Sequence, residues 1–217
     1  MGQDKDVTLT VLEDIAEEVK ECLLEEGQFE WRDVTDAYLV GKRELYAKGR
    51  NVKEAFIADT RLGKSSIAIK SADDDNTHIL RYKEENKGLP KEGEINMLPY
   101  ICQSPDEFSR IAKSPNIEQT AVVIDEGVSA VEGTGLDQGI EIAKRKHIMD
   151  VCAEKGVHIK ICSPDPSASA GCQLIHHVIG LSKTHKITKT KLYWFDHAEQ
   201  RKIPIGIVTW NVGELLE

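Results

Sequence analysis

The chain has 217 residues and a formal net charge of -9, which argues against general adhesion to nucleic acid or to an anionic membrane. Its length suits one substantial α/β core, because no Pro- or Gly-rich linker divides it into independent domains. No apolar run approaches the roughly 18 residues that span a bilayer, so we expect a cytoplasmic protein with no membrane partner.

Two amphipathic helices are expected before the first core strand. In residues 7–26 the apolar side chains recur at helical spacing, and Thr10 and Glu13 have the spacing of a capping box. A second helix is expected over residues 31–47. Residues 1–50 thus form a helical extension, and residues 51–217 form the main domain. The extension either covers an edge of the sheet or docks on a neighbouring subunit.

The loop after the first apolar strand carries the pattern of a phosphate-binding site. An apolar run at residues 55–58 leads into Gly-Lys-Ser at residues 63–65, and a helical segment is expected over residues 66–72. Successive backbone N–H groups at a helix N-terminus form a concave site for an anion. In the Walker A pattern G-x-x-x-x-G-K-[ST], glycine lets the backbone come close to the phosphates, lysine reaches the β- and γ-phosphates, and the hydroxyl coordinates Mg²⁺.

We therefore assign nucleotide binding to one continuous stretch of this loop. The stretch consists of Asp59, Thr60, Arg61, Leu62, Gly63, Lys64, Ser65 and Ser66. Lys64 is expected to neutralise phosphate charge, and the Ser65 hydroxyl is expected to bind Mg²⁺. Two residues depart from the pattern, because Ala58 replaces its first glycine and Asp59 brings a negative charge towards the phosphates.

The region after this loop is expected to alternate between short elements. An acidic turn is predicted at residues 72–76, and a short strand is predicted at residues 78–83. A further strand is expected within residues 95–102. Ser104 can cap a helix that begins at Pro105, and that helix would cross over to the next strand of a parallel sheet.

The most apolar strand of the chain ends in two carboxylates. Residues 120–126 read Thr-Ala-Val-Val-Ile-Asp-Glu, which is typical of a strand buried on both faces of a parallel sheet. Asp125 would then lie at the carboxyl end of the strand, where open α/β sheets bind ligands. Beside a magnesium-bound triphosphate, Asp125 would help to hold the ion and Glu126 would polarise the attacking water.

Residues 63–65 and 122–126 together resemble the Walker A and Walker B motifs of the P-loop NTPases. The glutamate directly after the Walker B aspartate is similar to that of the branch containing the RecA-like, AAA+ and FtsK–HerA ATPases. The chain looks most like small viral or plasmid ATPases of the FtsK–HerA type, which package or pump DNA. This resemblance covers about residues 50–210. It implies a three-layer α/β P-loop NTPase fold, with a mainly parallel central sheet and C-terminal antiparallel strands.

Two further residues receive roles near the γ-phosphate. Within a helix expected over residues 140–152, Arg145 is a candidate arginine finger that reaches a neighbour's nucleotide. The alternative is that Arg145 belongs to a solvated basic face. Ser163 follows the strand at residues 157–162, and the resemblance implies that it senses the γ-phosphate. Its alternative role is to cap the following turn.

The C-terminal third predicts three strands and a basic stretch. The strands lie at residues 176–181, 188–195 and 203–210, and the last two are joined as a hairpin. Between the first two lies a run with no acidic residue, whose candidate DNA-binding lysines are Lys183, Lys186, Lys189 and Lys191. They either contact phosphates on the inner surface of a ring or protect an exposed edge strand from pairing.

The leading hypothesis is a Mg²⁺-dependent ATPase motor that translocates or packages DNA as a homo-oligomeric ring. It would use ATP and Mg²⁺, with Lys64, Ser65, Asp125 and Glu126 around the phosphates. One alternative is a small-molecule kinase that phosphorylates a nucleoside or nucleotide. Another is a non-hydrolysing P-loop adaptor, which the departures at Ala58 and Asp59 favour. A GTP switch is disfavoured because the guanine-reading pattern N-K-x-D is missing from the sequence.

Overall fold

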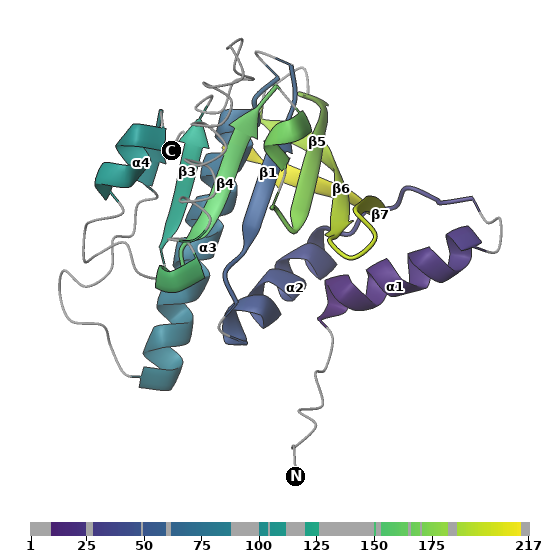
Figure 1. Ribbon diagram of the computed structural model, residues 1–217, viewed down its shortest axis with the longest axis horizontal. Coiled ribbons are helices and arrows are strands. Elements are labelled where there is room, and N and C mark those ends of the chain that lie inside the picture. The colour runs from purple at the N-terminus through teal and green to yellow at the C-terminus, as the bar shows by residue number, and fades with distance from the viewer. Residues whose placement is uncertain are drawn as a thin grey trace.

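A computed structural model shows the fold of the described part of the chain. The described residues are 10–24, 28–48, 50–59, 62–87, 100–103, 105–111, 120–125, 150, 153–164, 166–169, 171–181 and 186–213. They form a mixed seven-stranded sheet with helices packed against it (Figure 1), which confirms the predicted α/β class.

Within the described residues, two helices precede the first strand, and three consecutive strands follow the last helical turn. In chain order the elements are α1 (Val11–Leu24), α2 (Thr35–Ala47), β1 (Lys53–Ile57), α3 (Lys64–Lys87), β2 (Tyr100–Cys102), α4 (Pro105–Ile111), β3 (Ala121–Asp125), β4 (His158–Ser163), the 3-10 helix η2 (Pro166–Ser169), β5 (Leu174–Leu181), β6 (Ile187–Asp196) and β7 (Arg201–Asn211).

The strand order is β2-β3-β4-β1-β5-β6-β7. Every neighbouring pair from β2 to β5 is parallel, whereas the pairs β5–β6 and β6–β7 are antiparallel. The predicted mainly parallel sheet with antiparallel C-terminal strands is therefore confirmed. Because β1 lies between β4 and β5, the strand that precedes the candidate phosphate loop runs through the middle of the sheet.

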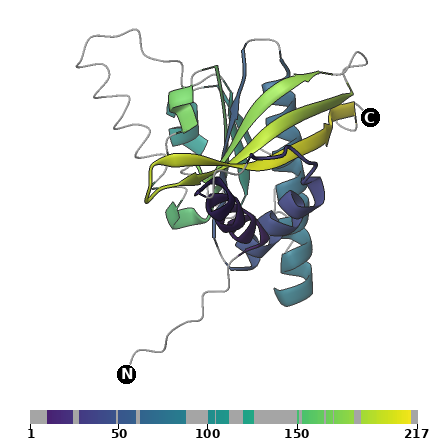
Figure 2. The same ribbon diagram turned by 90° about the vertical axis from the view of Figure 1, so that its right-hand side faces the viewer.

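The two faces of the sheet bury two separate hydrophobic cores. Alternation along β1 directs Phe56 into the first core with Leu12 of α1 and Tyr38 of α2, whereas Ala55 faces the second core with Phe108 of α4. Figure 2 shows α3 and α4 on opposite sides of the sheet. Since α1 and α2 supply side chains to the first core, the predicted helical extension packs on a face of the sheet.

The predicted capping box at the start of α1 is present. The Thr10 backbone N–H donates to Glu13 Oε2 at 2.8 Å, and the Glu13 N–H donates to Thr10 Oγ1 at 3.3 Å. These bonds satisfy two of the N–H groups that a helix leaves without intrahelical partners, so the sequence locates this helix start correctly.

Residues 31–34, just before α2, wrap around the outer strand β7. The Val34 N–H donates to the Ile207 carbonyl and the Ile207 N–H donates to the Arg32 carbonyl, both at 2.8 Å. The Trp31 ring packs against Tyr193 of β6, with ring centres 5.5 Å apart, on the face opposite α2. The prediction that helix begins at residue 31 is therefore wrong, because this backbone pairs with β7 before α2 begins.

Gly206 makes this wrapping possible, because a Cβ atom there would lie 2.7 Å from the Arg32 carbonyl oxygen and 2.6 Å from Val34 Cγ1. We expect Gly206→Ala to lower the free energy of unfolding by about 1–3 kcal/mol, since the backbone segment must move away. Urea unfolding measures the loss. Gly213→Ala is the matched control, because the nearest atoms there are Cβ, Cγ and Cδ of Lys186 at 3.2–3.3 Å and none of them is a backbone atom. An equal loss in both variants would contradict the clash.

Helix α3 is much longer than the sequence predicted. The expected acidic turn at residues 72–76 and the expected strand at residues 78–83 are both wrong, because the helix continues to Lys87. Two of its acidic residues form ion pairs: Asp74 pairs with Lys70 at 3.1 Å, and Asp75 pairs with Lys42 of α2 at 2.5 Å. Of the strand expected within residues 95–102, the structure describes only β2.

Candidate functional site

The two motif segments meet at the carboxyl edge of the sheet. Ser65 Oγ donates a hydrogen bond of 2.7 Å to Asp125 Oδ1, although the two residues are 60 positions apart. Ser65 lies in the first turn of α3, and Asp125 is the last residue of β3. The structure thus brings together the two residues to which the sequence assigned Mg²⁺.

Both β1 and β3 pair with β4, and the registers of these pairs show where β1 and β3 end relative to each other. Phe56 of β1 and Asp125 of β3 both lie opposite Cys162 of β4, so the two strands end at about the same level. The Ala58 N–H then donates to the Ser163 carbonyl at 3.3 Å and directs the chain into the loop. The carboxyl ends of β1, β3 and β4 therefore form one edge, as ligand sites of open α/β sheets require.

The turn into α3 depends on Gly63. Its φ of 80° lies in the left-handed region that glycine adopts without steric cost. The Ile67 N–H donates to the Gly63 carbonyl at 3.1 Å, and Cys162 Sγ lies 3.8 Å from the Lys64 carbonyl oxygen in a weak hydrogen bond. The first turn of α3 is thus fixed next to the end of β4, where helix N–H groups attract anions.

The other predicted loop residues differ in exposure. Lys64 is buried, with 3% of its surface accessible, and Leu62 is half-buried. Asp59 and Ser66 are exposed, so solvent screens the negative charge of Asp59. Thr60 and Arg61 lie outside the described residues.

Three predicted catalytic residues retain their roles as predictions only. Glu126 and Arg145 lie outside the described residues. Ser163 lies at the carboxyl end of β4 opposite Ile57, and it is fully buried. Its position at this edge is consistent with sensing a γ-phosphate, and that role stays a prediction.

The basic stretch lies on β6 and just before it. Lys186 and Lys189 are exposed, and Lys183 lies outside the described residues. Lys191 is half-buried, and its Nζ lies 4.5 Å from the centre of the Trp31 ring. Since β6 lies between β5 and β7, the interpretation of these lysines as protection of an edge strand is wrong.

The sequence did not predict a buried ionic cluster beneath α3, which we call the buried quartet. It consists of Lys42, Glu54, Asp75 and Lys160, all fully buried. Lys160 binds both carboxylates, and Lys42 lies 2.5 Å from Asp75 and 3.8 Å from Glu54. Equal numbers of opposite charges offset part of the cost of removing them from water.

Neutral side chains complete the shell around Glu54. The Tyr38 hydroxyl donates to Glu54 Oε1 at 2.5 Å, Ser71 Oγ donates to Oε2 at 2.9 Å, and His176 Nε2 lies 3.4 Å from Oε1. Burial alone would raise the pKa of Glu54, but the ammonium groups of Lys160 and Lys42 hold it well below its usual range. Burial lowers the pKa of His176, so its imidazole stays neutral at neutral pH.

A signal for the buried quartet exists in the sequence. Glu54 precedes the apolar run of β1, and Lys160 lies between two isoleucines of β4. The structure pairs Glu54 and Lys160 directly opposite each other. A charged residue within a buried strand requires a partner of opposite charge. The partner strand cannot be chosen from the sequence alone, because β1 and β4 are about 100 residues apart.

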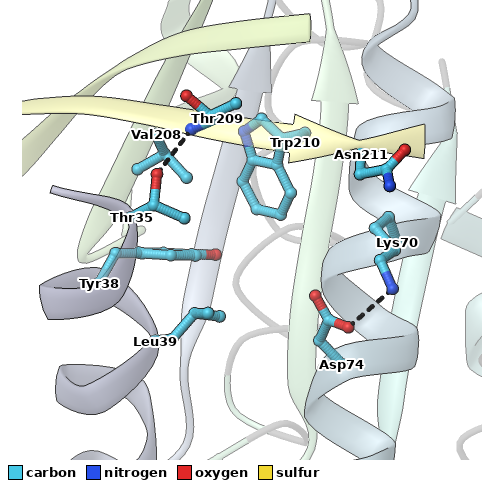
Figure 3. Close-up of a pocket in the computed structure, with 9 residues that line it drawn as sticks. All are labelled: Thr35, Tyr38, Leu39, Lys70, Asp74, Val208, Thr209, Trp210 and Asn211. Atoms are coloured by element: carbon cyan, nitrogen blue, oxygen red, sulfur yellow. Dashed lines mark hydrogen bonds and ion pairs between the residues drawn. The ribbon is translucent and has the colours of Figure 1, made fainter. Parts of the chain in front are cut away.

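Two cavities are found elsewhere on the described surface. One of about 250 Å³ lies between α2, α3 and β7, where Tyr38 and Trp210 face the Lys70–Asp74 ion pair (Figure 3). Another of about 540 Å³ lies beside α1 and the β6–β7 hairpin. Ser65 and Asp125 are not among the described residues that line either cavity, so both cavities are distinct from the motif site.

No model of a known protein family matches this chain, and no curated protein matches it in sequence. None of the helices in the described ranges is long and apolar enough to cross a membrane. The function is therefore inferred from the residues of the site.

Proposed function

We propose that this chain is a Mg²⁺-dependent ATP hydrolase that works as a motor on DNA. The observation that carries the proposal is the 2.7 Å hydrogen bond between Ser65 and Asp125. It places a hydroxyl and a carboxylate together beside a helix N-terminus, at the edge of the sheet where α/β proteins bind ligands.

The residues at this edge fit a magnesium ion. Mg²⁺ prefers oxygen ligands and keeps several waters, so it needs only one or two protein oxygens besides those of the phosphates. Ser65 and Asp125 supply such oxygens, and both side chains are half-buried, which leaves one side of each open. Ser65 and Asp125 would hold the ion, and its positive charge would stabilise the charge of the phosphates.

The remaining tasks fall to the loop and to the residue after β3. Gly63 and the first N–H groups of α3 would bind the phosphates, and the Lys64 ammonium would neutralise their charge. Glu126 follows Asp125 directly and would orient the attacking water. These roles assign binding, charge and proton handling to separate side chains.

The motor part of the proposal rests on the basic stretch and on assembly. Lys186 and Lys189 are exposed, so their ammonium groups are accessible to phosphates. In a homo-oligomeric ring, Arg145 of one subunit would reach the nucleotide of the next.

We expect Asp125→Asn to lower the rate of ATP hydrolysis by about 100-fold or more, because it weakens the Mg²⁺ site and its contact with Ser65. The measurement is release of inorganic phosphate with ATP and Mg²⁺. Asp36→Asn is the matched control, since it removes an exposed carboxylate in the first turn of α2, outside the site, and its rate should change less than about threefold. Equal rates for the two variants would contradict the site.

Glu126→Gln separates binding of ATP from its hydrolysis. The variant should keep ATP affinity, because the phosphates contact the loop, and should lose turnover, because the amide cannot take a proton from water. Unchanged hydrolysis would remove Glu126 from the mechanism. Turnover stimulated by DNA, together with the oligomer mass, supports the motor. Phosphate transfer to a nucleoside would indicate a kinase, and absence of nucleotide binding would indicate an adaptor.

A further inference from the structure

Aromatic rings and cationic groups gather on one face of the antiparallel part of the sheet. They come from the segment before α2 and from β5, β6 and β7, and none of them is fully buried. We call this set the aromatic–basic face, and it consists of Trp31, His177, Lys191, Tyr193 and Lys202.

Short contacts join these five side chains into one continuous surface. The Tyr193 ring centre lies 5.5 Å from that of Trp31 and 5.2 Å from that of His177. The Lys191 ammonium lies 4.5 Å from the centre of the Trp31 ring, and Lys202 Nζ lies 3.4 Å from His177 Nε2. His177 and Lys191 are direct cross-strand partners. The surface is therefore ordered by the pairing of β5, β6 and β7.

The electrostatic balance of this face is positive. Within the part of the chain that the structure describes, neither Lys191 nor Lys202 forms an ion pair with a carboxylate. Burial lowers the pKa of His177, and the charges of Lys202 and Lys191 lower it further, so the imidazole stays neutral. Asp33, which precedes α2, accepts hydrogen bonds from Thr35 and Thr209.

Trp31 is not explained by packing of the interior. It belongs to neither hydrophobic core, and it is half-buried beside Phe29, with ring centres 4.9 Å apart. Trp and Tyr are enriched at interfaces, and a cation over the face of a Trp ring is attracted to it. The backbone bonds of residues 32 and 34 to β7 hold this ring in place.

We propose that the aromatic–basic face binds single-stranded nucleic acid without sequence preference. Trp31 and Tyr193 would stack with bases, and Lys191 and Lys202 would contact phosphates. A duplex hides the faces of its bases, and an acidic peptide would use the lysines but not the rings. Only a single strand uses both kinds of side chain. This proposal rests on the proposed motor function. It adds that the nucleic acid is single-stranded and binds at the aromatic–basic face.

The location suits a strand that runs past the nucleotide site. Because β5 is parallel to β1 and β6 is antiparallel to β5, β6 starts at the edge where β1 ends. Lys189 therefore lies nearer that edge, and Lys191 and Tyr193 follow on the same face of β6 at a spacing of two residues. Phosphates and bases could follow this row away from the nucleotide site.

The test is binding of a fluorescein-labelled single-stranded oligothymidine of about 16 nucleotides, measured by fluorescence anisotropy without ATP. Trp31→Ala should weaken binding about 5- to 150-fold, which is the range for loss of one stacked base. Lys191→Gln should weaken it and reduce the slope of log affinity against log salt by about 0.7. Trp31→Phe keeps a ring and should retain most of the affinity.

Matched controls on other surfaces exclude general effects of charge and folding. Trp194→Ala changes the residue after Tyr193 in β6, whose side chain packs on the opposite face of the sheet. Lys48→Gln removes an exposed lysine at the end of α2. Both should bind the oligothymidine as the parent does, and circular dichroism checks that every variant is folded.

Two outcomes would overturn the inference. One is that folded Trp31→Ala and Lys191→Gln variants bind the oligothymidine as tightly as the parent. The other is that poly-glutamate or a blunt duplex competes as well as the single strand. Because the assay contains no ATP, its result does not depend on hydrolysis. Failure of this binding leaves the proposed hydrolase intact, and absence of hydrolysis leaves this surface testable.

Discussion

Lys160→Met is expected to lower the free energy of unfolding by about 3–5 kcal/mol, because it leaves two buried carboxylates without their shared cation. Glu54 and Asp75 are fully buried, and both bind Lys160. Lys42 alone would then compensate two negative charges. Since domains are stable by only about 5–15 kcal/mol, the loss would be visible as a large shift of the urea midpoint.

Two variants control this prediction. Lys53→Met changes a half-exposed lysine of the adjacent strand β1 and should alter stability by less than about 0.5 kcal/mol. In the double variant Glu54→Gln/Lys160→Met, the remaining Lys42–Asp75 pair balances its own charge. The double variant should therefore be less destabilised than the sum of the two single variants. Full stability of Lys160→Met would show that the buried quartet contributes little.

Acidification is expected to destabilise the fold well before ordinary carboxylates titrate. Burial lowers the pKa of His158 from 6.5 to about 3, and the Val52 N–H donates to its unprotonated Nδ1 at 2.9 Å. The unfolded chain binds this proton below about pH 6.5, whereas the folded chain does not until about pH 3. The contribution of His158 to the free energy of unfolding is thus complete above pH 6.5. It falls by about 1.4 kcal/mol per pH unit between pH 6.5 and pH 3, or roughly 5 kcal/mol in total.

Other buried groups act in the same direction. Burial also lowers the pKa of His176, which strengthens the loss of stability below pH 6.5. The lowered pKa values of Glu54 and Asp75 add to it only below about pH 4.5. Urea unfolding between pH 8 and pH 4 measures the slope. In His158→Asn an amide oxygen can replace Nδ1 as acceptor, so the slope should be flatter by about 1.4 kcal/mol per unit. An unchanged slope would contradict the assignment.

The features that the sequence predicted correctly are local ones. The capping box of Thr10 and Glu13 involves neighbours three residues apart. The apolar runs at β1, β3 and β4 are visible as buried strands because they show few charges. An exception is the contact between Ser65 and Asp125, which are 60 positions apart. It was expected because each residue belongs to a short motif, and the role of the contact stays a prediction.

The features that the sequence did not predict depend on partners far along the chain. The acidic residues of α3 suggested a solvated turn, but Asp75 binds Lys42 and Lys160, and Asn76 accepts a hydrogen bond from the Ala121 N–H at 2.8 Å. Trp31 suggested the start of a helix, but its place is set by β6 and β7. Such contacts become visible only when the register of the strands is known.

The wrapping of residues 31–34 around β7 has a consequence for how the protein behaves when concentrated. An outermost strand with free backbone groups invites another chain to add itself by strand pairing. In this fold the Ile207 N–H and carbonyl, in the middle of β7, are already paired with the Arg32 carbonyl and the Val34 N–H. Detaching this short strap would uncover a template for self-association, so changes that loosen it should show first as turbidity or fibre formation on storage.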